Sequence, residues 1–251
     1  MSEFSEPSCV IVKHTNPCGV SSSGKINMAY KKALDSDKKS SFGGVVLLNR
    51  KINIKLAKEL SKHFFELIAA PDFDREALKL LKLKKNLILL KLNKIKISNQ
   101  NFRSTIFGTL FQSNNDTKID TKILKLKTLK KIKSSLKNEL VFATKVVKHL
   151  KSNAVVLSHN KQTLGIGCGQ TNRIDALNTA IKNFKKNFKS SNFVCASDGF
   201  FPFTDSVKLL KKNNCRAIAQ PSGSINDKKI IDYAKNNKMT LFHIKNRLFK
   251  H

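Results

Sequence analysis

Short apolar runs alternate with amphipathic stretches along all 251 residues of the chain, and this alternation restricts the fold more than any other feature. The apolar runs predict strands at residues 9–13, 45–48, 67–70, 87–90, 105–111, 154–157, 163–166, 217–219 and 240–243. Apolar residues that recur three or four positions apart predict helices at 26–34, 54–63, 75–83, 140–150, 173–184, 205–210 and 225–234. Strands that alternate with helices indicate an α/β fold with layered packing.

The alternation is interrupted once, by a polar and Lys-rich stretch at residues 114–138. Such a stretch is typical of a boundary between lobes. We therefore expect a first lobe at residues 1–125 and a second at residues 126–251. Their similar content of strands and helices suggests a structural duplication, although no clear sequence repeat accompanies it.

The formal net charge of +31 raises the possibility of a Lys-rich nucleic-acid-binding protein. Only six of the 48 basic residues are Arg, however, and Arg is the residue preferred for forked contacts with phosphates and guanines. Lysines spread along the whole chain are more typical of solvated helix faces or of compositional drift. Nucleic-acid binding therefore remains the less favoured interpretation.

Several features indicate a cytoplasmic protein without a membrane span. Apolar runs stay far below the roughly 20 residues that a membrane helix needs, and the N-terminus does not resemble a signal peptide. The five cysteines are dispersed and form no C-x-x-C pair, so we expect reduced thiols and neither a disulfide framework nor a structural zinc site.

Polar and glycine residues cluster directly after apolar strands, where α/β folds place their sites. The clusters lie at residues 13–19, 151–153, 165–170, 197–205 and 220–224. Each is weak by itself: a lone histidine after a strand is more often structural, and GIGCGQ lacks the spacing of a dinucleotide-binding fingerprint.

Taken together and in order, the clusters and their surroundings are similar to one family. The segments are VKHTNPCGV, SSFGGVV, FATKVVKHLKSNAVVL, TLGIGCGQTNRIDA, ASDGFFPFTD, IAQPSGSINDKKII and RLFKH. They resemble the formyltransferase region of the bifunctional purine-biosynthesis family, which acts on aminoimidazole carboxamide ribonucleotide (AICAR), over residues 5–251. The resemblance implies two cytidine-deaminase-like three-layer α/β/α lobes and a homodimer with active sites at its interface.

The resemblance also implies a reaction and its catalytic residues. A formyl group would pass from 10-formyltetrahydrofolate, the cosubstrate, to the 5-amino group of AICAR in purine (IMP) biosynthesis. The catalytic residues of the family correspond to Lys13, His14 and Asn153. Because adjacent side chains on an extended strand point to opposite faces, both Lys13 and His14 can serve one site only if the chain bends at or just after Lys13.

Binding residues carry over in the same way. The AICAR contacts correspond to Gly43, Glu66, Arg173, Phe200 and Arg247, and the folate contacts correspond to Ile174, Asp205, Ser224 and Ile225. No metal is expected, because the zinc signature of the deaminases, H-x-E with P-C-x-x-C, is absent: Asn16 stands two residues after His14, and Cys18 has no second cysteine at the required spacing.

The sequence departs from the family at its start and at two internal positions. The family has a preceding cyclohydrolase domain and an Arg-Tyr-Gly segment that binds the substrate phosphate, whereas this sequence begins within the formyltransferase region. Phe107 stands where the family more often has Gly, and Gly199 where it often has Ala. Either a separate polypeptide supplies the missing parts, or the chain is a truncated, inactive remnant. The intact catalytic clusters favour the first explanation.

Overall fold

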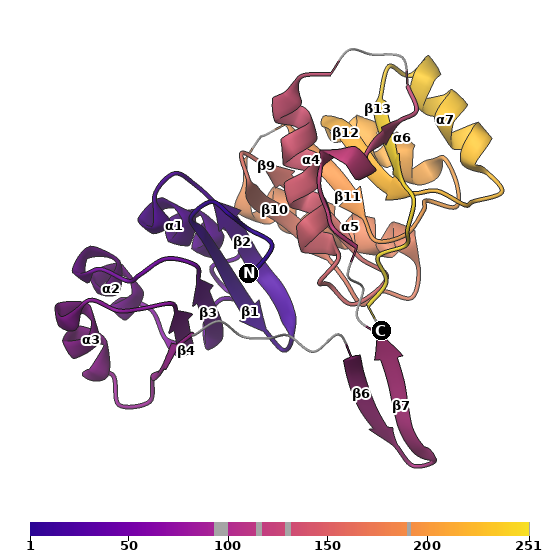
Figure 1. The fold of residues 1–251 in the computed structure, drawn as a ribbon. Coiled ribbons are helices and arrows are strands. Elements are labelled where there is room, and N and C mark those ends of the chain that lie inside the picture. Colours follow the sequence, from indigo (N-terminus) through magenta and orange to yellow (C-terminus); the bar gives the residue numbers. More distant parts are fainter. Residues whose placement is uncertain (93–99, 114–116, 129–131, 190–191, 251) are drawn as a thin grey trace.

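The computed structural model describes residues 1–92, 100–113, 117–128, 132–189 and 192–250. Within them the chain forms one mixed sheet of 11 strands and a separate two-stranded hairpin (Figure 1). The strands of the sheet, in spatial order, are β5 (Ile88–Lys91), β4 (Phe65–Ala70), β3 (Gly44–Leu48), β1 (Ser8–Lys13), β2 (Asn16–Ser22), β10 (Gln162–Gly167), β9 (Val155–His159), β11 (Phe193–Ser197), β12 (Cys215–Pro221), β13 (Thr240–Ile244) and β8 (Lys125–Leu126). The α/β fold expected from the sequence is confirmed.

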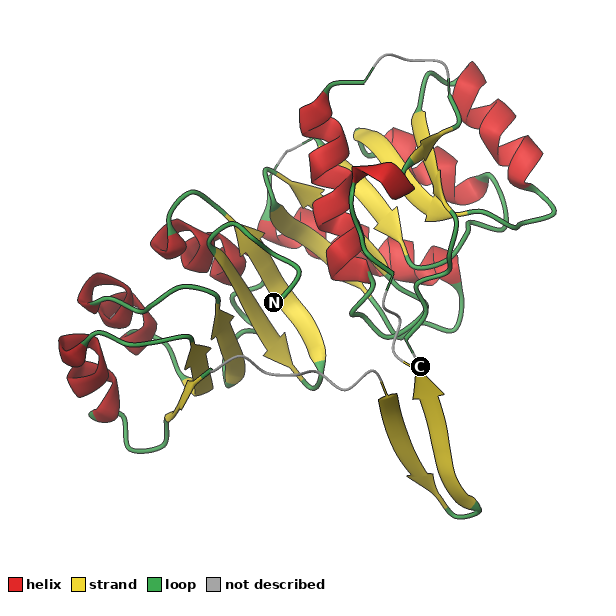
Figure 2. Cartoon of the chain, in the orientation of Figure 1, coloured by secondary structure: helices red, strands yellow, loops and turns green. Residues whose placement is uncertain are grey.

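Helices connect the strands, as Figure 2 shows. They are α1 (Ile26–Ser36), α2 (Ile54–Ser61), α3 (Arg75–Lys82), α4 (Ser134–Val147), α5 (Arg173–Asn187), α6 (Asp205–Lys212) and α7 (Asp227–Asn236), with a 3-10 turn at Thr121–Ile123. No helix in the described part of the chain is long and apolar enough to span a membrane.

Two details of the sequence prediction needed correction. The single strand predicted at residues 105–111 is wrong, because a turn between β6 (Gln100–Thr105) and β7 (Gly108–Ser113) makes it a hairpin. The prediction also missed β2, whose Gly and Ser residues were assigned to a turn, and β11. Part of the predicted boundary at 114–138 lies outside the described residues, and the rest contains β8 and the start of α4.

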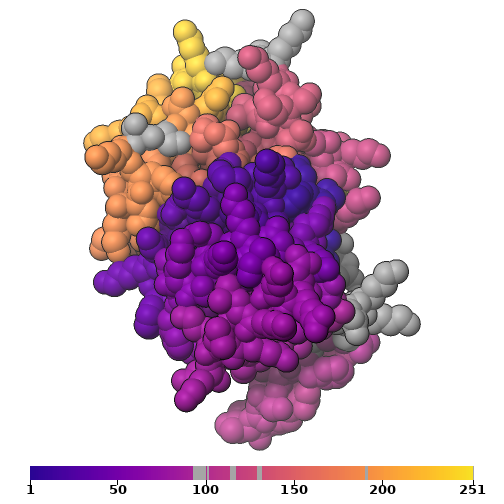
Figure 3. All heavy atoms as spheres, turned by 90° about the vertical axis from the view of Figure 1, so that its left-hand side faces the viewer, coloured from indigo at the N-terminus to yellow at the C-terminus, as the bar shows by residue number. Residues whose placement is uncertain are grey.

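The two halves of the sheet repeat one topology. The first half, β1 to β5 with α1 to α3, has the spatial order β2-β1-β3-β4-β5, and the second half, α4 to β13, has the order β10-β9-β11-β12-β13. In each half the first three strands pair antiparallel and the last three pair parallel. β2 and β10 join the halves antiparallel. In Figure 3 the first half faces the viewer and the second half lies behind it.

The cores lie on both faces of this sheet. On one face, α1, α2 and α3 cover the first half, and α5, α6 and α7 cover the second. On the other face, α4 packs against the second half, and the same core reaches β1 and β2 of the first half through Val10 and Val20. Close packing of α1 and α5 requires glycine at equivalent strand positions: a Cβ at Gly19 would lie 2.0 Å from the Ala33 carbonyl oxygen, and one at Gly165 would lie 2.1 Å from that of Ala180.

Candidate functional site

Strand direction brings the sequence-predicted residues to one edge of the sheet. The strands run in two opposite directions. One group is β1, β10, β11, β12 and β13, and the other is β2, β3, β4, β5 and β9. The carboxyl ends of the first group therefore lie at the same edge of the sheet as the amino ends of the second group. This edge, the site edge, is the lower one in Figure 1. It holds Lys13, His14, Gly43, Glu66, Asn153, Arg173, Ile174, Phe200, Asp205, Ser224, Ile225 and Arg247.

Lys13 and His14 lie at the tight turn that joins β1 to β2. The pairing of Lys13 with Asn16 leaves a two-residue loop, in which His14 has φ 49° and Thr15 has φ 66°. Two positive φ angles define the turn type that matches the twist of a hairpin, and Asn-Gly usually supplies them. A β-branched residue such as Thr15 is strained there, and strain of this kind clusters at functional sites. The bend expected after Lys13 is confirmed.

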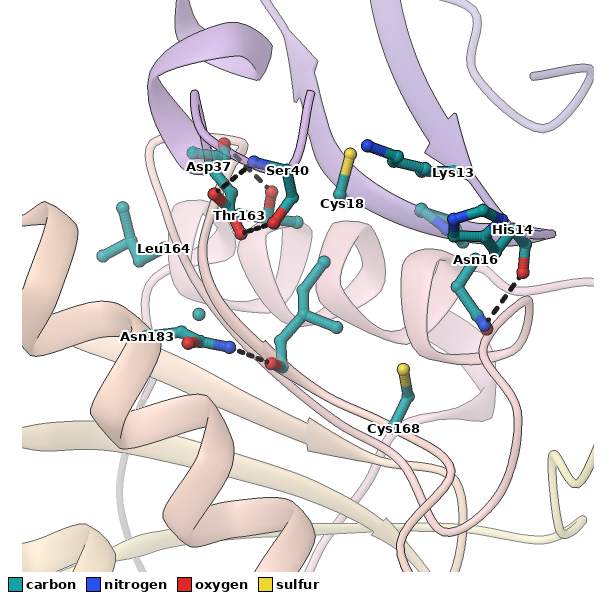
Figure 4. A pocket seen from close by; sticks show the side chains of 14 residues that line it. Lys13, His14, Asn16, Cys18, Asp37, Ser40, Thr163, Leu164, Cys168 and Asn183 are labelled. Carbon is teal, nitrogen blue, oxygen red and sulfur yellow. Dashed lines mark hydrogen bonds between the residues drawn. The ribbon is translucent and has the colours of Figure 1, made fainter. Parts of the chain in front are cut away.

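A cavity of about 520 Å³ opens beside this turn. Lys13 and His14 line one end, and residues of β10 and α5 such as Leu164 and Asn183 line the other (Figure 4). Asp37 and Ser40 also line the cavity. The backbone N–H and the hydroxyl of Ser40 donate to the carboxylate of Asp37 at 3.0 and 2.6 Å. The volume falls within the range of pockets that bind small metabolites.

The lysine is fixed against the neighbouring strand of the first half. Lys13 Nζ donates to the Phe42 carbonyl oxygen at 2.6 Å, next to Gly43. Gly43 has φ 68°, and a Cβ there would lie 3.9 Å from Glu66 Oε1. The contacts thus group Lys13, Gly43 and the exposed Glu66 on the first half of the site edge.

A charged network lies below the surface of the second half, around Asn153. Arg173 Nη2 donates to Asn153 Oδ1 at 2.6 Å, and Arg173 Nη1 forms an ion pair with Asp198. Asp198 is 0% exposed and Arg173 is 7% exposed, so the pair is buried. Asp198 also accepts from the Ser152 hydroxyl and from the Ala154 backbone N–H, the latter at 3.0 Å. Asn153 Nδ2 donates to the Gln170 carbonyl oxygen at 2.8 Å, which fixes the side-chain amide at both ends.

This network is linked to the turn of the first half and to the C-terminal segment. The Lys151 backbone N–H donates to Asn16 Oδ1 at 3.2 Å. Arg173 and Arg247 lie against the Phe249 ring at 5.9 and 5.8 Å, and Arg247 also lies 5.1 Å from the Phe200 ring. Three of the predicted AICAR contacts, namely Arg173, Phe200 and Arg247, therefore form one stacked group.

The predicted folate residues lie farther along the edge. The loop that leads to α6 and the loop that leads to α7 are joined by Asn226 Nδ2, which donates to the Pro202 carbonyl oxygen at 2.9 Å. Asp205 begins α6, and Ser224 and Ile225 precede α7. Ile174 is adjacent to Arg173 at the start of α5. The structure places these residues in the second half but not in the cavity.

The cysteines near the site are protected from ionisation. Burial raises the pKa of the Cys18 and Cys168 thiols, both of which line the cavity. All five cysteines are free thiols. A thiolate is the form that attacks an electrophile, so these side chains serve the cavity as neutral groups. Among the described residues there is also no cluster of histidine, cysteine and carboxylate side chains able to hold a metal ion.

Several residues of the network were not predicted individually from the sequence. They are Asn16, Ser152, Gln170, Asp198 and Phe249. Four of them lie within or next to the polar clusters that follow strands, which is the signal that points to them. The partner of a buried carboxylate cannot be read from such a cluster, because Arg173 and Asp198 are 25 residues apart.

Comparison with known proteins gives a consistent result. The family model of the AICARFT/IMPCHase bienzyme matches residues 1–183. Relatives described as "Bifunctional purine biosynthesis protein PurH" include that of Caldicellulosiruptor saccharolyticus, 44% identical over 252 residues, which cover 100% of this chain and 49% of the relative. The relative from Persephonella marina is 44% identical over 253 residues (99% and 49%), and that from a Thermoanaerobacter species is 45% identical over 249 residues (99% and 49%).

The chain thus spans about half the length of the curated relatives it matches. The matched family model nevertheless covers most of the 251 residues, including the Lys13-His14 turn, the cavity and Arg173. The chain therefore belongs to the AICARFT/IMPCHase bienzyme family.

Proposed function

We propose that this chain carries the AICAR formyltransferase activity of its family, which adds a formyl group to the 5-amino group of AICAR. One observation carries the proposal. The turn with Lys13 and His14 opens onto a cavity at the edge of the sheet where Arg173 and Gln170 fix the amide of Asn153. The adjacent Lys13 and His14 thus lie at the same edge as Asn153, which is distant in sequence, and together they have the chemistry that acyl transfer requires.

The proposed roles follow from what each side chain can do. The AICAR amine is a weak nucleophile and must lose a proton as it attacks the formyl carbon. The exposed His14 imidazole accepts that proton as the general base. The Lys13 ammonium stabilises the negative charge that develops on the formyl oxygen and delivers a proton to the departing folate nitrogen. Asn153 holds the carboxamide of the substrate next to the reacting amine.

The remaining predicted residues would bind the two substrates. Gly43, Glu66, Arg173, Phe200 and Arg247 would contact AICAR. 10-Formyltetrahydrofolate supplies the formyl group, and Ile174, Asp205, Ser224 and Ile225 would hold it.

The geometry around α6 and α7 fits such a ligand. Asp205 uses Oδ1 to accept from the Ser206 backbone N–H at 2.6 Å, and its Oδ2 has no partner among the described residues. That oxygen is therefore open to donors on a heterocyclic ring. The fully exposed Ile225 side chain, in the loop that leads to α7, offers an apolar surface.

The proposal extends to the architecture and the assembly. The repeated topology supports two cytidine-deaminase-like lobes, with residues 1–125 and 126–251 as their bounds. The β6–β7 hairpin supports a homodimer: it projects from the body in Figure 1, and Phe102, Phe107 and Leu110 are 67%, 93% and 61% exposed. Apolar side chains exposed on a projecting hairpin are typical of a surface that another subunit covers. We place the protein in the cytoplasm, with a separate polypeptide carrying the cyclohydrolase domain and the phosphate-binding segment.

A reconstitution assay tests the activity. The chain is mixed with the half of the Caldicellulosiruptor saccharolyticus relative that lies outside the match, and formyl-AICAR is measured after addition of AICAR and 10-formyltetrahydrofolate. We expect turnover that His14→Ala lowers by a factor of 10² to 10⁴, the range of general acid–base catalysis. His159→Ala, at the opposite edge of the sheet, is the matched control and should leave turnover unchanged. Unchanged turnover in His14→Ala would disprove the mechanism, and no turnover in any mixture would favour an inactive remnant.

A further inference from the structure

The two halves of the sheet share their register as well as their topology. Val10 pairs with Leu47 in the first half as Val156 pairs with Ala196 in the second. Leu47 pairs in turn with Ala69, and Ala196 with Ala219. The equivalence continues to the outer strands, where Ala69 pairs with Leu90 and Ala219 with Phe242. Each strand residue on the face that α4 covers in the second half therefore has a defined counterpart in the first half.

Two counterparts, Val10 and Ala69, are buried like their equivalents, at 8% and 1% exposed, but the others differ in burial. In the second half, Val156, Val194, Ala196, Ala217, Ala219 and Phe242 are at most 2% exposed, because α4 and the segment before it lie over them. In the first half, Val45, Leu47 and Leu67 are only half-buried, with Leu47 at the margin of the core that contains α4, and Ile88 and Leu90 are 59% and 45% exposed. The residues are no more polar than those of the second half. We call this set (Val45, Leu47, Leu67, Ile88 and Leu90) the open face.

An equivalent of α4 would complete the open face. In the second half α4 immediately precedes β9, and its Leu140, Ala143 and Val147 reach the strands. We propose that the open face is the docking site of an amphipathic helix from a partner polypeptide, which occupies the position that α4 occupies in the second half. The inference rests on the proposed function, because the partner is the polypeptide proposed there. The curated relatives are about twice as long as this chain, so half of each relative lies outside the match and has length enough to supply the helix.

The shape of the open face restricts the helix that fits it. Leu47 and Leu67 stand where the second half has Ala196 and Ala217. The small alanines lie in the same core as large residues of α4 such as Phe142 and Leu140. Interiors are packed to nearly constant density, so larger strand residues require smaller helix residues. The partner helix should therefore present alanine and other small residues to the sheet.

A binding experiment tests the docking site. The probe is again the half of the Caldicellulosiruptor saccharolyticus relative outside the match, titrated calorimetrically into the full 251-residue chain. Leu90→Lys places an ammonium on β5, at the outer edge of the open face, where it must lose its hydration when the partner covers it. We expect the Kd to rise at least tenfold. Leu83→Lys is the matched control: Leu83 is 77% exposed but lies at the end of α3, away from the open face, and its Kd should not change.

Several outcomes of this experiment would contradict the proposed docking site. Circular dichroism first establishes that both variants fold. An unchanged Kd for Leu90→Lys, equal weakening by both variants, or no binding by the unsubstituted chain would each overturn the inference. So would a dimer of the chain alone that Leu90→Lys dissociates in sedimentation, because a second copy would then be the occupant. Turnover is measured separately, so binding that Leu90→Lys weakens in a mixture without turnover would support the docking site and count against the proposed enzyme.

Discussion

Asn49 in the first half and Asp198 in the second occupy equivalent positions and do different things. Each follows the third strand of its half, and each accepts the backbone N–H at the start of the first strand: Ser8 N–H to Asn49 Oδ1 at 2.8 Å, and Ala154 N–H to Asp198 Oδ1 at 3.0 Å. Asn49 then donates through Nδ2 to the carbonyl oxygens of Phe4 and Glu6 at 3.0 and 2.8 Å. Asp198 cannot donate, and instead binds Arg173 and Ser152.

The difference shows how one fold position serves structure in one half and the candidate site in the other. The side-chain amide of Asn49 both donates and accepts hydrogen bonds. It joins the N-terminal segment to the end of β3 through bonds to backbone groups alone. A carboxylate in the same place is a buried charge and requires a cation. Arg173 supplies the cation, and its second nitrogen holds Asn153. Because a buried ion pair contributes little net stability over apolar packing, the placement of Asn153 explains it better than stability does.

The largest effect is expected when Asp198 is replaced by asparagine, the residue that the first half has at the equivalent position. Asp198→Asn leaves the Arg173 guanidinium buried without its counter-ion, and breaking a buried pair costs about 3–5 kcal/mol. We expect that loss in urea unfolding. In the reconstituted mixture we expect kcat to fall on the order of 10²-fold, since a displaced Asn153 no longer aligns the substrate.

A double variant separates stability from positioning. Arg173→Met in the Asp198→Asn background removes the unpaired charge and should recover most of the free energy of unfolding. It should not recover kcat, because nothing then holds the Asn153 amide. Recovery of both quantities would show that the pair is only structural, and the functional reading of the comparison would be wrong.

The sequence was sufficient for the α/β class, most elements and the bend after Lys13, because these depend on local patterns. Residues 173–184 and 205–210 have helical spacing, and the pair Lys13-His14 has the family's surroundings. The Asp198–Arg173 pair, and the position of the predicted site residues at one edge of the sheet, depend on pairing between strands that are far apart in sequence. A pattern of single residues does not encode that pairing. β2 was missed because its Gly and Ser residues are typical of turns, whereas Gly19 is there to let α1 approach.

The equivalence of the halves can be sharpened with a matched pair of glycine substitutions. Gly19→Ala and Gly165→Ala each place a methyl group about 2 Å from a helix carbonyl oxygen, that of Ala33 or Ala180. Overpacking of this kind costs about 1–3 kcal/mol. We expect both variants to lose similar amounts in urea unfolding. A loss confined to one variant would show that the close approach of helix to strand is needed in only one half.

The smallest expected effect concerns the contact between Glu3, near the N-terminus, and the residues that follow α4 in the second half. Glu3 accepts from Lys148 at 2.9 Å and from His149 at 2.6 Å, just beyond the end of α4. Burial by itself raises the pKa of Glu3, but the hydrogen bonds from His149 and Lys148 outweigh it and lower the pKa from 4.5 to about 2. Because the pKa of Glu3 is lower in the folded chain than in the unfolded chain, ionised Glu3 stabilises the fold at pH values above about 4.5. This stabilisation is lost as the pH falls from about 4.5 through about 2.

Glu3→Gln should therefore destabilise the chain by about 1 kcal/mol at neutral pH and leave it unchanged near pH 2. Unfolding by urea at a series of pH values measures this difference. Glu6→Gln is the control, because Glu6 and its partner Lys161 form an exposed ion pair, and such pairs contribute little. If Glu3→Gln kept the full pH dependence of the unsubstituted chain, the N-terminal segment would not be held to α4 by charge, and the packing of Phe4 against Phe142 at 5.7 Å would be what joins the halves there.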